Sequence, residues 1–162
     1  MKQYYLVLIL ILLSVQHSLA MAEDFHVVIS GTANHLGHTR YNEKNWGLGF
    51  EYDFEERNKW IPFLTGSRFL DSNKNWSNYL GGGTKRRFLL QGEREGLHLD
   101  LGVVGFLMTR IDYKEGKPFP GALPFASVGN QWIAINATYV PKIDPKMVQF
   151  FYFQLMLKVA EF

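Results

Sequence analysis

The sequence predicts an all-β protein: an eight-stranded antiparallel up-and-down transmembrane β-barrel preceded by an N-terminal signal peptide. Residues 46–53 alternate between large apolar and small or charged side chains, which is the pattern of a barrel wall with one lipid face and one lumen face. The 162 residues include 13 Phe, 8 Tyr, 4 Trp and 15 Gly, a composition that favours strands. After residue 22 no apolar stretch reaches the roughly 20 residues that a membrane helix needs.

The first residues have the composition of an export signal. A short positive segment at 1–3 is followed by an apolar run over 4–15, and small residues at 18–22 fit the usual cleavage rule. The run is too short for a spanning helix. We therefore predict a cleaved signal peptide over residues 1–22 and one outer-membrane β-barrel domain over residues 23–162.

The composition after the signal excludes several classes of protein. The chain has no cysteine, which excludes a disulfide framework and a lipid-anchored cysteine. From residue 23 onward 16 basic and 15 acidic residues remain, so nothing indicates a nucleic-acid partner. An exported protein without disulfides needs another source of stability, and a closed barrel supplies one.

Four strands are predicted in the first half of the chain, over residues 25–34, 46–53, 59–70 and 78–90. In the second of them Trp46 and Leu48 share the predicted lipid face, whereas Glu51 and Asp53 share the lumen face. Pro62 lacks an N–H for the ladder, so a bulge or bend is expected there. The three glycines at 81–83 indicate a bend or a close approach inside the fourth strand.

Four further strands are predicted over residues 97–110, 122–129, 131–140 and 148–162. The first of these places His98 and Asp100 in the lumen and then Phe106, which predicts a lumen that is polar at one end and apolar at the other. Gly129 and Asn130 form a tight hairpin signal. Phe162 ends the chain on an aromatic residue, as outer-membrane barrels usually do.

Three residues stand out as candidates for chemistry: His35, Asp71 and Ser72. Antiparallel strand order brings the end of the first strand and the end of the third to the same rim, which places them near one another. A hydroxyl with a histidine base and an orienting carboxylate is the residue set of acyl transfer. Adjacent residues on a regular strand point to opposite faces, so only a turn presents Asp71 and Ser72 together.

The residues alone leave a simpler interpretation open. Asp-Ser before Asn is ordinary turn chemistry, and a histidine in a polar loop is usually exposed to solvent. The sequence contains no convincing metal-ligand spacing, no Gly-rich phosphate loop after a strand and no Gly-x-Ser-x-Gly elbow.

Four stretches, in order along the chain, resemble the lipid A palmitoyltransferase (PagP) family. They are Arg40-Tyr41-Asn42-Glu43 with Trp46-Gly47-Leu48-Gly49-Phe50, Phe69-Leu70-Asp71-Ser72, Leu123-Pro124-Phe125-Ala126-Ser127-Val128-Gly129, and Thr138-Tyr139-Val140-Pro141. The resemblance implies an eight-stranded outer-membrane barrel that moves a palmitoyl group from a glycerophospholipid to lipid A, without a cofactor. The expected partners are the phospholipid donor, the lipid A acceptor and the outer-membrane bilayer, with no nucleic acid, and we expect a monomer.

The same resemblance assigns site residues. Asp71 and Ser72 match the family's Asp-Ser pair, and His35 is the best match for its histidine, with His38 and His26 as weaker matches. Gly83 falls at the floor of the family's acyl-chain pocket, where the residue sets chain length. Arg110 corresponds to an arginine in an outer loop.

The chain departs from the family pattern in two places. It has no room for the family's N-terminal amphipathic helix before the first strand, and its first outer loop is several residues shorter. Two alternatives therefore remain beside the acyltransferase: a non-enzymatic barrel that binds lipid or host components through its outer loops, and a lipid A deacylase. An open apolar pocket near Gly83 would favour an acyl-chain enzyme, and a filled lumen would favour the binding protein.

Overall fold

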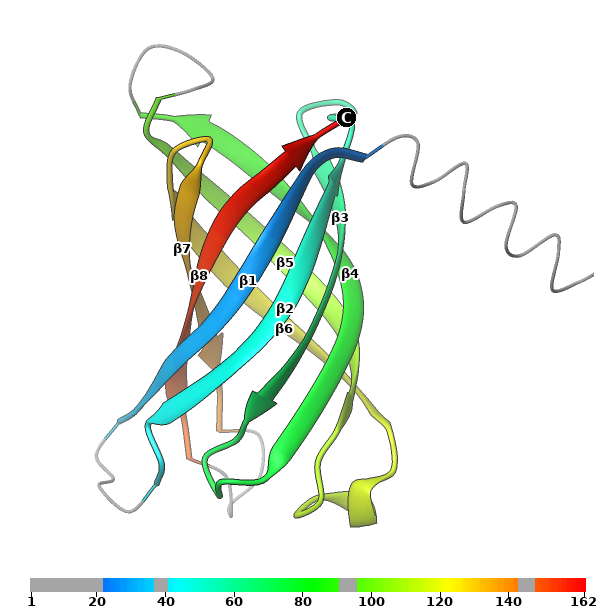
Figure 1. Ribbon diagram of the computed structural model, residues 1–162, viewed down its shortest axis with the longest axis vertical. Coiled ribbons are helices and arrows are strands. Elements are labelled where there is room, and N and C mark those ends of the chain that lie inside the picture. Colours follow the sequence, from blue (N-terminus) through cyan, green and yellow to red (C-terminus); the bar gives the residue numbers. More distant parts are fainter. Residues whose placement is uncertain (1–21, 37–40, 91–95, 143–147) are drawn as a thin grey trace, which may run out of the picture.

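The computed structural model describes residues 22–36, 41–90, 96–142 and 148–162, and these residues form a closed antiparallel barrel of eight strands in chain order (Figure 1). The fold prediction is therefore confirmed. The strands are β1 Ala22–His35, β2 Lys44–Phe54, β3 Ile61–Leu70, β4 Trp76–Leu89, β5 His98–Thr109, β6 Phe119–Gly129, β7 Ile133–Val140 and β8 Phe150–Glu161. β1 pairs with both β2 and β8, which closes the sheet and leaves no edge strand.

The two ends of the barrel differ. Ala22 and Phe162 lie at one end, the upper end in Figure 1, which we call the terminal end. The last residues of β1, β3, β5 and β7 lie at the opposite end, which we call the distal end. The β5–β6 connection contains a short 3₁₀ turn, Lys114–Gly116. His35 and the turn after Leu70 therefore share the distal end.

The predicted alternation of faces is confirmed in β2. Trp46 and Leu48 are 60% and 63% exposed on the outer surface, whereas Glu51 and Asp53 are 3% and 2% exposed in the lumen. This alternation of exposed and buried side chains follows from strand geometry alone, because successive side chains on any strand point to opposite faces.

The lumen is layered along the barrel axis. Near the middle, the rings of Phe63 and Phe125 meet edge to face with their centroids 5.5 Å apart. On the distal side, Gln154 donates to Ser30 Oγ and to the Tyr79 hydroxyl, each at 3.3 Å. Buried charged groups fill the terminal side; they are Glu51, Asp53, Lys85 and Asp100. The prediction of a polar lumen at the terminal end is thus confirmed, but the prediction of an apolar lumen at the other end is wrong, because buried hydrogen-bonded side chains also fill the distal half.

Two local predictions need correction. Pro62 causes no bulge: β3 pairs with β4 through Pro62↔Thr84 without a register shift. The missing N–H is tolerated because the β2 ladder ends at Asp53↔Phe63, one residue short of the proline. β6 begins at Phe119 rather than at Ala122, inside the segment expected to be a loop.

The predicted signal peptide falls almost wholly on residues 1–21, outside the described residues, so it stays a prediction. β1 begins at Ala22, three residues before the predicted start. Within the described ranges, no helix has the length and the apolar character required to cross a membrane.

Candidate active site

The distal end joins the hydroxyl of Ser72 to the imidazole of His35. Ser72 Oγ lies 3.0 Å from His35 Nε2, which is the separation expected of a nucleophile and its base. The imidazole is held between two rings, with centroids 4.8 Å from Tyr41 and 5.0 Å from Phe150. Because His35 is only 6% exposed, its ring orientation is fixed by packing.

A bulge in β1 aims His35 into the lumen. His26, Val28 and Ser30 are the buried positions in the first part of the strand. Between Ser30 and Thr32 the pairing with β8 slips by one residue, from Ser30↔Gln154 to Thr32↔Phe153. An extra residue reverses which positions face inward, so the odd-numbered His35 becomes buried. In a regular strand His35 would face outward.

The carboxylate of Asp71 organises the turn that presents Ser72. Asp71 Oδ1 accepts hydrogen bonds from the backbone N–H of Asn73 at 2.8 Å and of Asn75 at 2.9 Å. Its Oδ2 accepts from Ser77 Oγ at 3.1 Å. β3 has already ended at Leu70, so Asp71 and Ser72 lie in a turn, as their joint presentation requires.

Arg110 clamps the β5–β6 connection onto this turn. Its guanidinium donates to Asp112 through two bonds of 3.0 and 2.8 Å, and lies 3.7 Å from Asp71 Oδ2. Asn73 Nδ2 donates to Asp112 Oδ2 at 2.5 Å. Partial burial opposes ionisation of Asp112, but the hydrogen bond and charge of Arg110 outweigh it and hold the pKa of that carboxyl below its usual range. The clamp brings a cation to the rim that holds Ser72.

Two asparagines, Asn42 before β2 and Asn45 within it, bind the backbone around the same turn. The backbone N–H of Asn42 donates to the Ser72 carbonyl at 2.9 Å. Asn45 Nδ2 donates to the Leu70 carbonyl at 2.9 Å. With Tyr41, Phe150, Asn73 and Asp112, these asparagines are site residues that sequence reasoning missed. The sole signal for any of them was the Tyr41-Asn42 part of a stretch that resembles the family.

Gly83 lies about halfway along β4, where its position in the barrel wall faces Phe63. A Cβ atom at Gly83 would lie 2.7 Å from Phe63 Cζ and 2.1 Å from the Val103 carbonyl oxygen, so the predicted close approach at the glycine run is present. The lumen beside Gly83 is therefore occupied by the Phe63 ring.

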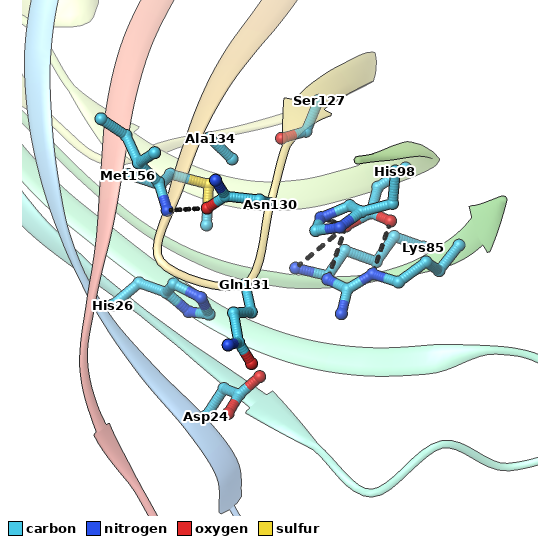
Figure 2. Close-up of a pocket in the computed structure, with 12 residues that line it drawn as sticks. Asp24, His26, Lys85, His98, Ser127, Asn130, Gln131, Ala134 and Met156 are labelled. Carbon is cyan, nitrogen blue, oxygen red and sulfur yellow. Dashed lines mark hydrogen bonds and ion pairs between the residues drawn. The ribbon is translucent and has the colours of Figure 1, made fainter. Parts of the chain in front are cut away.

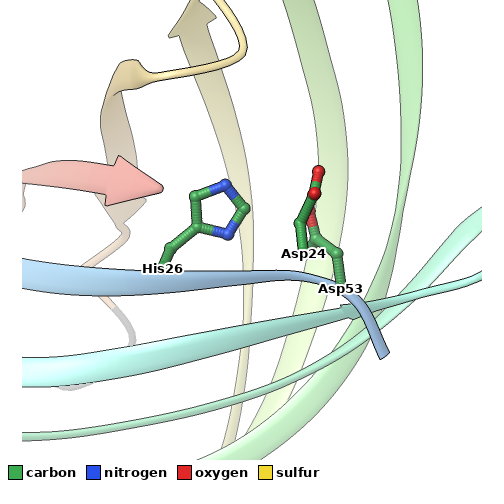
Figure 3. Close-up of side chains that lie close together, drawn as sticks. All are labelled: Asp24, His26 and Asp53. Atoms are coloured by element: carbon green, nitrogen blue, oxygen red, sulfur yellow. The ribbon is translucent and has the colours of Figure 1, made fainter. Parts of the chain in front are cut away.

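Of the two weaker candidate histidines, the structure describes only His26, which does not join Ser72. His38 lies outside the described residues. His26 lies at the terminal end, beside Asp24 and Asp53 (Figure 3), and the three offer possible metal-ligand atoms within 4.8 Å of one another. Both carboxylates already hold a lysine, with Lys158 Nζ 2.5 Å from Asp24 and Lys85 Nζ 2.7 Å from Asp53. These lysines neutralise the acidic ligands, so the residues present do not favour a cation.

A small polar cavity adjoins this cluster (Figure 2). His26, Lys85 and His98 line it, and Asp100 receives two bonds of 2.9 Å from Arg87. Its cations are matched by buried carboxylates, which makes it part of a structural ion network rather than a second reactive centre.

Comparison with known proteins places most of the chain in one protein family. Residues 20–154 match the family model described as "Antimicrobial peptide resistance and lipid A acylation protein PagP". The chain is 33% identical over 102 residues to the lipid A acyltransferase PagP of Methylobacillus flagellatus, covering 62% of this chain and 53% of that protein. It is 33% identical over 103 residues to the lipid A acyltransferase PagP of Shigella boydii, covering 63% and 54%. The matched part thus spans about half the length of these relatives.

Among solved structures, the attachment invasion locus protein Ail of Yersinia pestis aligns with 14% identity and a TM-score of 0.46, over 85% of this chain and 98% of that one. Fold and site together define a closed eight-stranded barrel with a serine–histidine pair at one mouth. The chain belongs to the PagP family.

Proposed function

We propose that this protein is an outer-membrane acyltransferase that moves a palmitoyl chain from a glycerophospholipid to lipid A. The observation that carries the proposal is the 3.0 Å contact between Ser72 Oγ and His35 Nε2 at the mouth of the barrel. The named activity of the PagP relatives supports it.

The side chains on the outer surface support the proposal that the barrel spans a bilayer. Apolar side chains that are more than half exposed gather on the outward face; they are Leu48, Leu80, Val103, Leu107 and Ile135. Exposed tryptophans flank them at both ends, with Trp46 and Trp76 distal and Trp60 and Trp132 terminal. An apolar band between two aromatic girdles is the exterior of a membrane barrel. We propose that the distal end, which holds Ser72, faces the outer leaflet, where lipid A lies.

In the proposed reaction Ser72 is the nucleophile and His35 is the general base. His35 Nε2 takes the hydroxyl proton as Ser72 Oγ attacks the donor's ester carbonyl. The proton then passes to the departing glycerol oxygen, which leaves an acyl-serine. A lipid A hydroxyl then attacks this ester while His35 accepts its proton. The bond between Ser72 Oγ and the acyl group breaks, His35 returns the proton to Ser72 Oγ, and the acylated lipid A leaves. Arg110 supplies positive charge at the rim where the oxyanion develops.

The wall of the barrel offers a lateral route for the acyl chain. β6 pairs with β7 only over Phe125–Gly129 and Ala134–Thr138, so residues 119–124 have no partner in β7 in the distal half. Pro120 and Pro124 in this segment have no N–H to offer a neighbouring strand. The segment pairs with β5 on its other side, and the missing β7 partner supports entry of a lipid tail from the bilayer at this height.

The depth of the lumen supports a palmitoyl chain. Gly83 pairs with Phe63, and Leu70 at the rim pairs with Trp76. Seven residue steps of roughly 3.3 Å at a tilt of roughly 40° give a depth on the order of 18 Å. That depth is close to the length of an extended palmitoyl chain, so Gly83 is proposed as the floor.

Substituting Gly83 with alanine is expected to shift the transferred chain from palmitoyl to a shorter acyl group. The added methyl group would push against Phe63 and the Val103 carbonyl and raise the floor, with a cost in stability of about 1–3 kcal/mol from overpacking. Gly105→Ala is the matched control, because the nearest atom to a Cβ there, the Gly82 oxygen, lies 3.9 Å away. The measurement is mass spectrometry of lipid A after incubation with phospholipids of mixed chain length. An unchanged palmitoyl preference in Gly83→Ala would remove Gly83 from the floor.

Asp71 is proposed to position Ser72 through the turn. Asp71→Asn keeps an oxygen that accepts from the N–H groups of Asn73 and Asn75, whereas Asp71→Ala keeps none. We expect Asp71→Asn to retain transfer within about 10-fold and Asp71→Ala to lose about 10²-fold, because a misplaced reactive group costs that much. Initial rates in bilayer vesicles test this. An equal loss in both variants would show that the negative charge itself is needed.

The filled lumen beside Gly83 favours a second candidate, a non-enzymatic barrel that binds lipid or host components through its distal loops. The two functions separate in vesicles that contain lipid A and a phospholipid with a labelled palmitoyl chain. Label in lipid A supports the transferase. Label released as free fatty acid identifies a lipid A-independent hydrolase, and release of an acyl group from lipid A identifies a deacylase. No movement of any acyl chain by folded protein supports the binding barrel.

A further inference from the structure

The outward face near the distal end carries an arginine among apolar neighbours. Arg68 is exposed and shares its face of β3 with Leu64, which is 39% exposed. It pairs in register with Leu48 on β2 and with Asn78 on β4. Its side chain therefore points toward the surrounding lipid and not into the lumen.

Two tryptophans hold the guanidinium in place. Arg68 Cζ lies 5.0 Å from the centroid of the Trp76 ring. Trp76 is supported in turn by Trp46, at 5.7 Å and 76° between the ring planes. A guanidinium stacked on a ring keeps its N–H groups available at its edge. Among the described residues, Arg68 has no carboxylate within ion-pair distance.

The energetics of a lipid-facing charge fix the depth of this group. An arginine on the outer face of a barrel costs about 2–4 kcal/mol at the bilayer midplane and about 0–1 kcal/mol near the interface. Tryptophans also gather at headgroup level. Arg68, Trp46 and Trp76 therefore lie in the headgroup layer of the outer leaflet, where the anionic groups are phosphates. A planar guanidinium binds a phosphate through two parallel N–H bonds.

We propose that Arg68, stacked on Trp76, binds a phosphate of the lipid A headgroup and so selects and positions the acceptor. This inference rests on the proposed function. Arg68 precedes Ser72 by four residues, so their Cα atoms lie at most about 14 Å apart. A phosphorylated sugar headgroup that is held at Arg68 therefore keeps an acceptor hydroxyl within reach of Ser72. Arg68 is a specificity residue and takes no part in bond making.

The test compares Arg68→Ala and Arg68→Gln with wild type in vesicles of zwitterionic phospholipid and bisphosphorylated lipid A. Transfer is measured as the lipid A fraction is raised. Both variants are expected to raise the KM for lipid A about 10-fold with kcat unchanged, because binding is lost and chemistry is not. Arg68→Lys should recover part of the loss, since it keeps the charge without the planar fork.

Arg86→Ala is the matched control. Arg86 lies on the outer face of β4 near the terminal end, with its Cζ 5.3 Å from the Phe88 ring centroid. It has the same stacking at the opposite rim, and its substitution should leave the KM unchanged. With dephosphorylated lipid A, wild type and the Arg68 variants should have equal KM values.

A binding measurement separates this inference from the proposed function. Retention of bisphosphorylated lipid A by detergent-solubilised protein, read by native mass spectrometry, should fall about 10-fold in Arg68→Ala. Equal retention and equal KM in wild type and variant would overturn the inference. An equal loss on dephosphorylated lipid A would assign Arg68 to the donor phosphate and would also overturn it. Absence of transfer in wild type, with retention still lost in Arg68→Ala, would contradict the proposed function and support the binding site.

Discussion

Replacing Ser72 with alanine is expected to lower the rate of acyl transfer by about 10³-fold or more while the barrel stays folded. The same result is expected for His35→Ala. Ser72 Oγ and His35 Nε2 lie 3.0 Å apart, and a pair that acts as one unit loses most of its effect when either member is removed. The double variant should therefore be no slower than the single variants. Initial rates with labelled donor phospholipid in vesicles give the comparison.

Serine at position 77 provides the control for this prediction. Ser77 is another hydroxyl of the same region, fully buried, and its Oγ donates to Asp71 Oδ2 at 3.1 Å. Ser77→Ala should cost much less activity than Ser72→Ala, because it removes one support of the turn and leaves the reactive pair. Rates in Ser72→Ala close to wild type would exclude the serine as nucleophile.

Replacing Lys85 with methionine is expected to destabilise the barrel by about 3–5 kcal/mol. Lys85 is 2% exposed, and its Nζ lies 2.8 Å from Glu51 and 2.7 Å from Asp53. A third carboxylate, Asp100, has its Oδ2 3.9 Å from Lys85 Nζ. Methionine fills the same space but leaves buried carboxylates without their cation, and that loss is larger than the value of an exposed ion pair. Urea unfolding in lipid vesicles measures the change.

Neutralising the acids tests the cause of this loss. Glu51→Gln and Asp53→Asn combined with Lys85→Met should recover a large part of the lost stability, because no buried charge then lacks a partner. Arg86→Ala, one residue along on the outer face, should change the free energy of unfolding by less than about 1 kcal/mol. A Lys85→Met barrel as stable as wild type would show that the ion network contributes nothing to folding.

The barrel could be predicted because its signal is local and repeated. Alternation in β2 separates Trp46 and Leu48 from Glu51 and Asp53, and a period of two is typical of a strand with two different faces. Strand order alone then placed His35 at the same rim as Ser72. Both inferences follow from the sequence without knowledge of packing.

The details of the site depend on contacts between distant residues. The bulge between Ser30 and Thr32, which turns His35 inward, has no motif of its own. Phe150 meets His35 from the last strand of the chain, and Arg110 reaches Asp71 through a connection whose shape is set by tertiary contacts. At Pro62 the local signal was misleading. Proline predicted a bulge, but the ladder with β2 ends one residue short of it, so no hydrogen bond is lost there.

The ion network at the terminal end could be predicted only in part from the sequence. Glu51, Asp53, His98 and Asp100 could be assigned to the lumen from alternation. Lys85 follows the run Gly81–Gly83, where the pattern has no side chains to read, so its pairing with three carboxylates required the closed barrel.

The most direct test of the central claim is mass spectrometry of lipid A from cells that make the wild-type protein or Ser72→Ala at equal levels of folded barrel. The proposed acyltransferase predicts lipid A species heavier by one palmitoyl group with the wild-type protein, and their absence with Ser72→Ala. Lipid A of identical mass in both, with folded protein in the outer membrane, would contradict it.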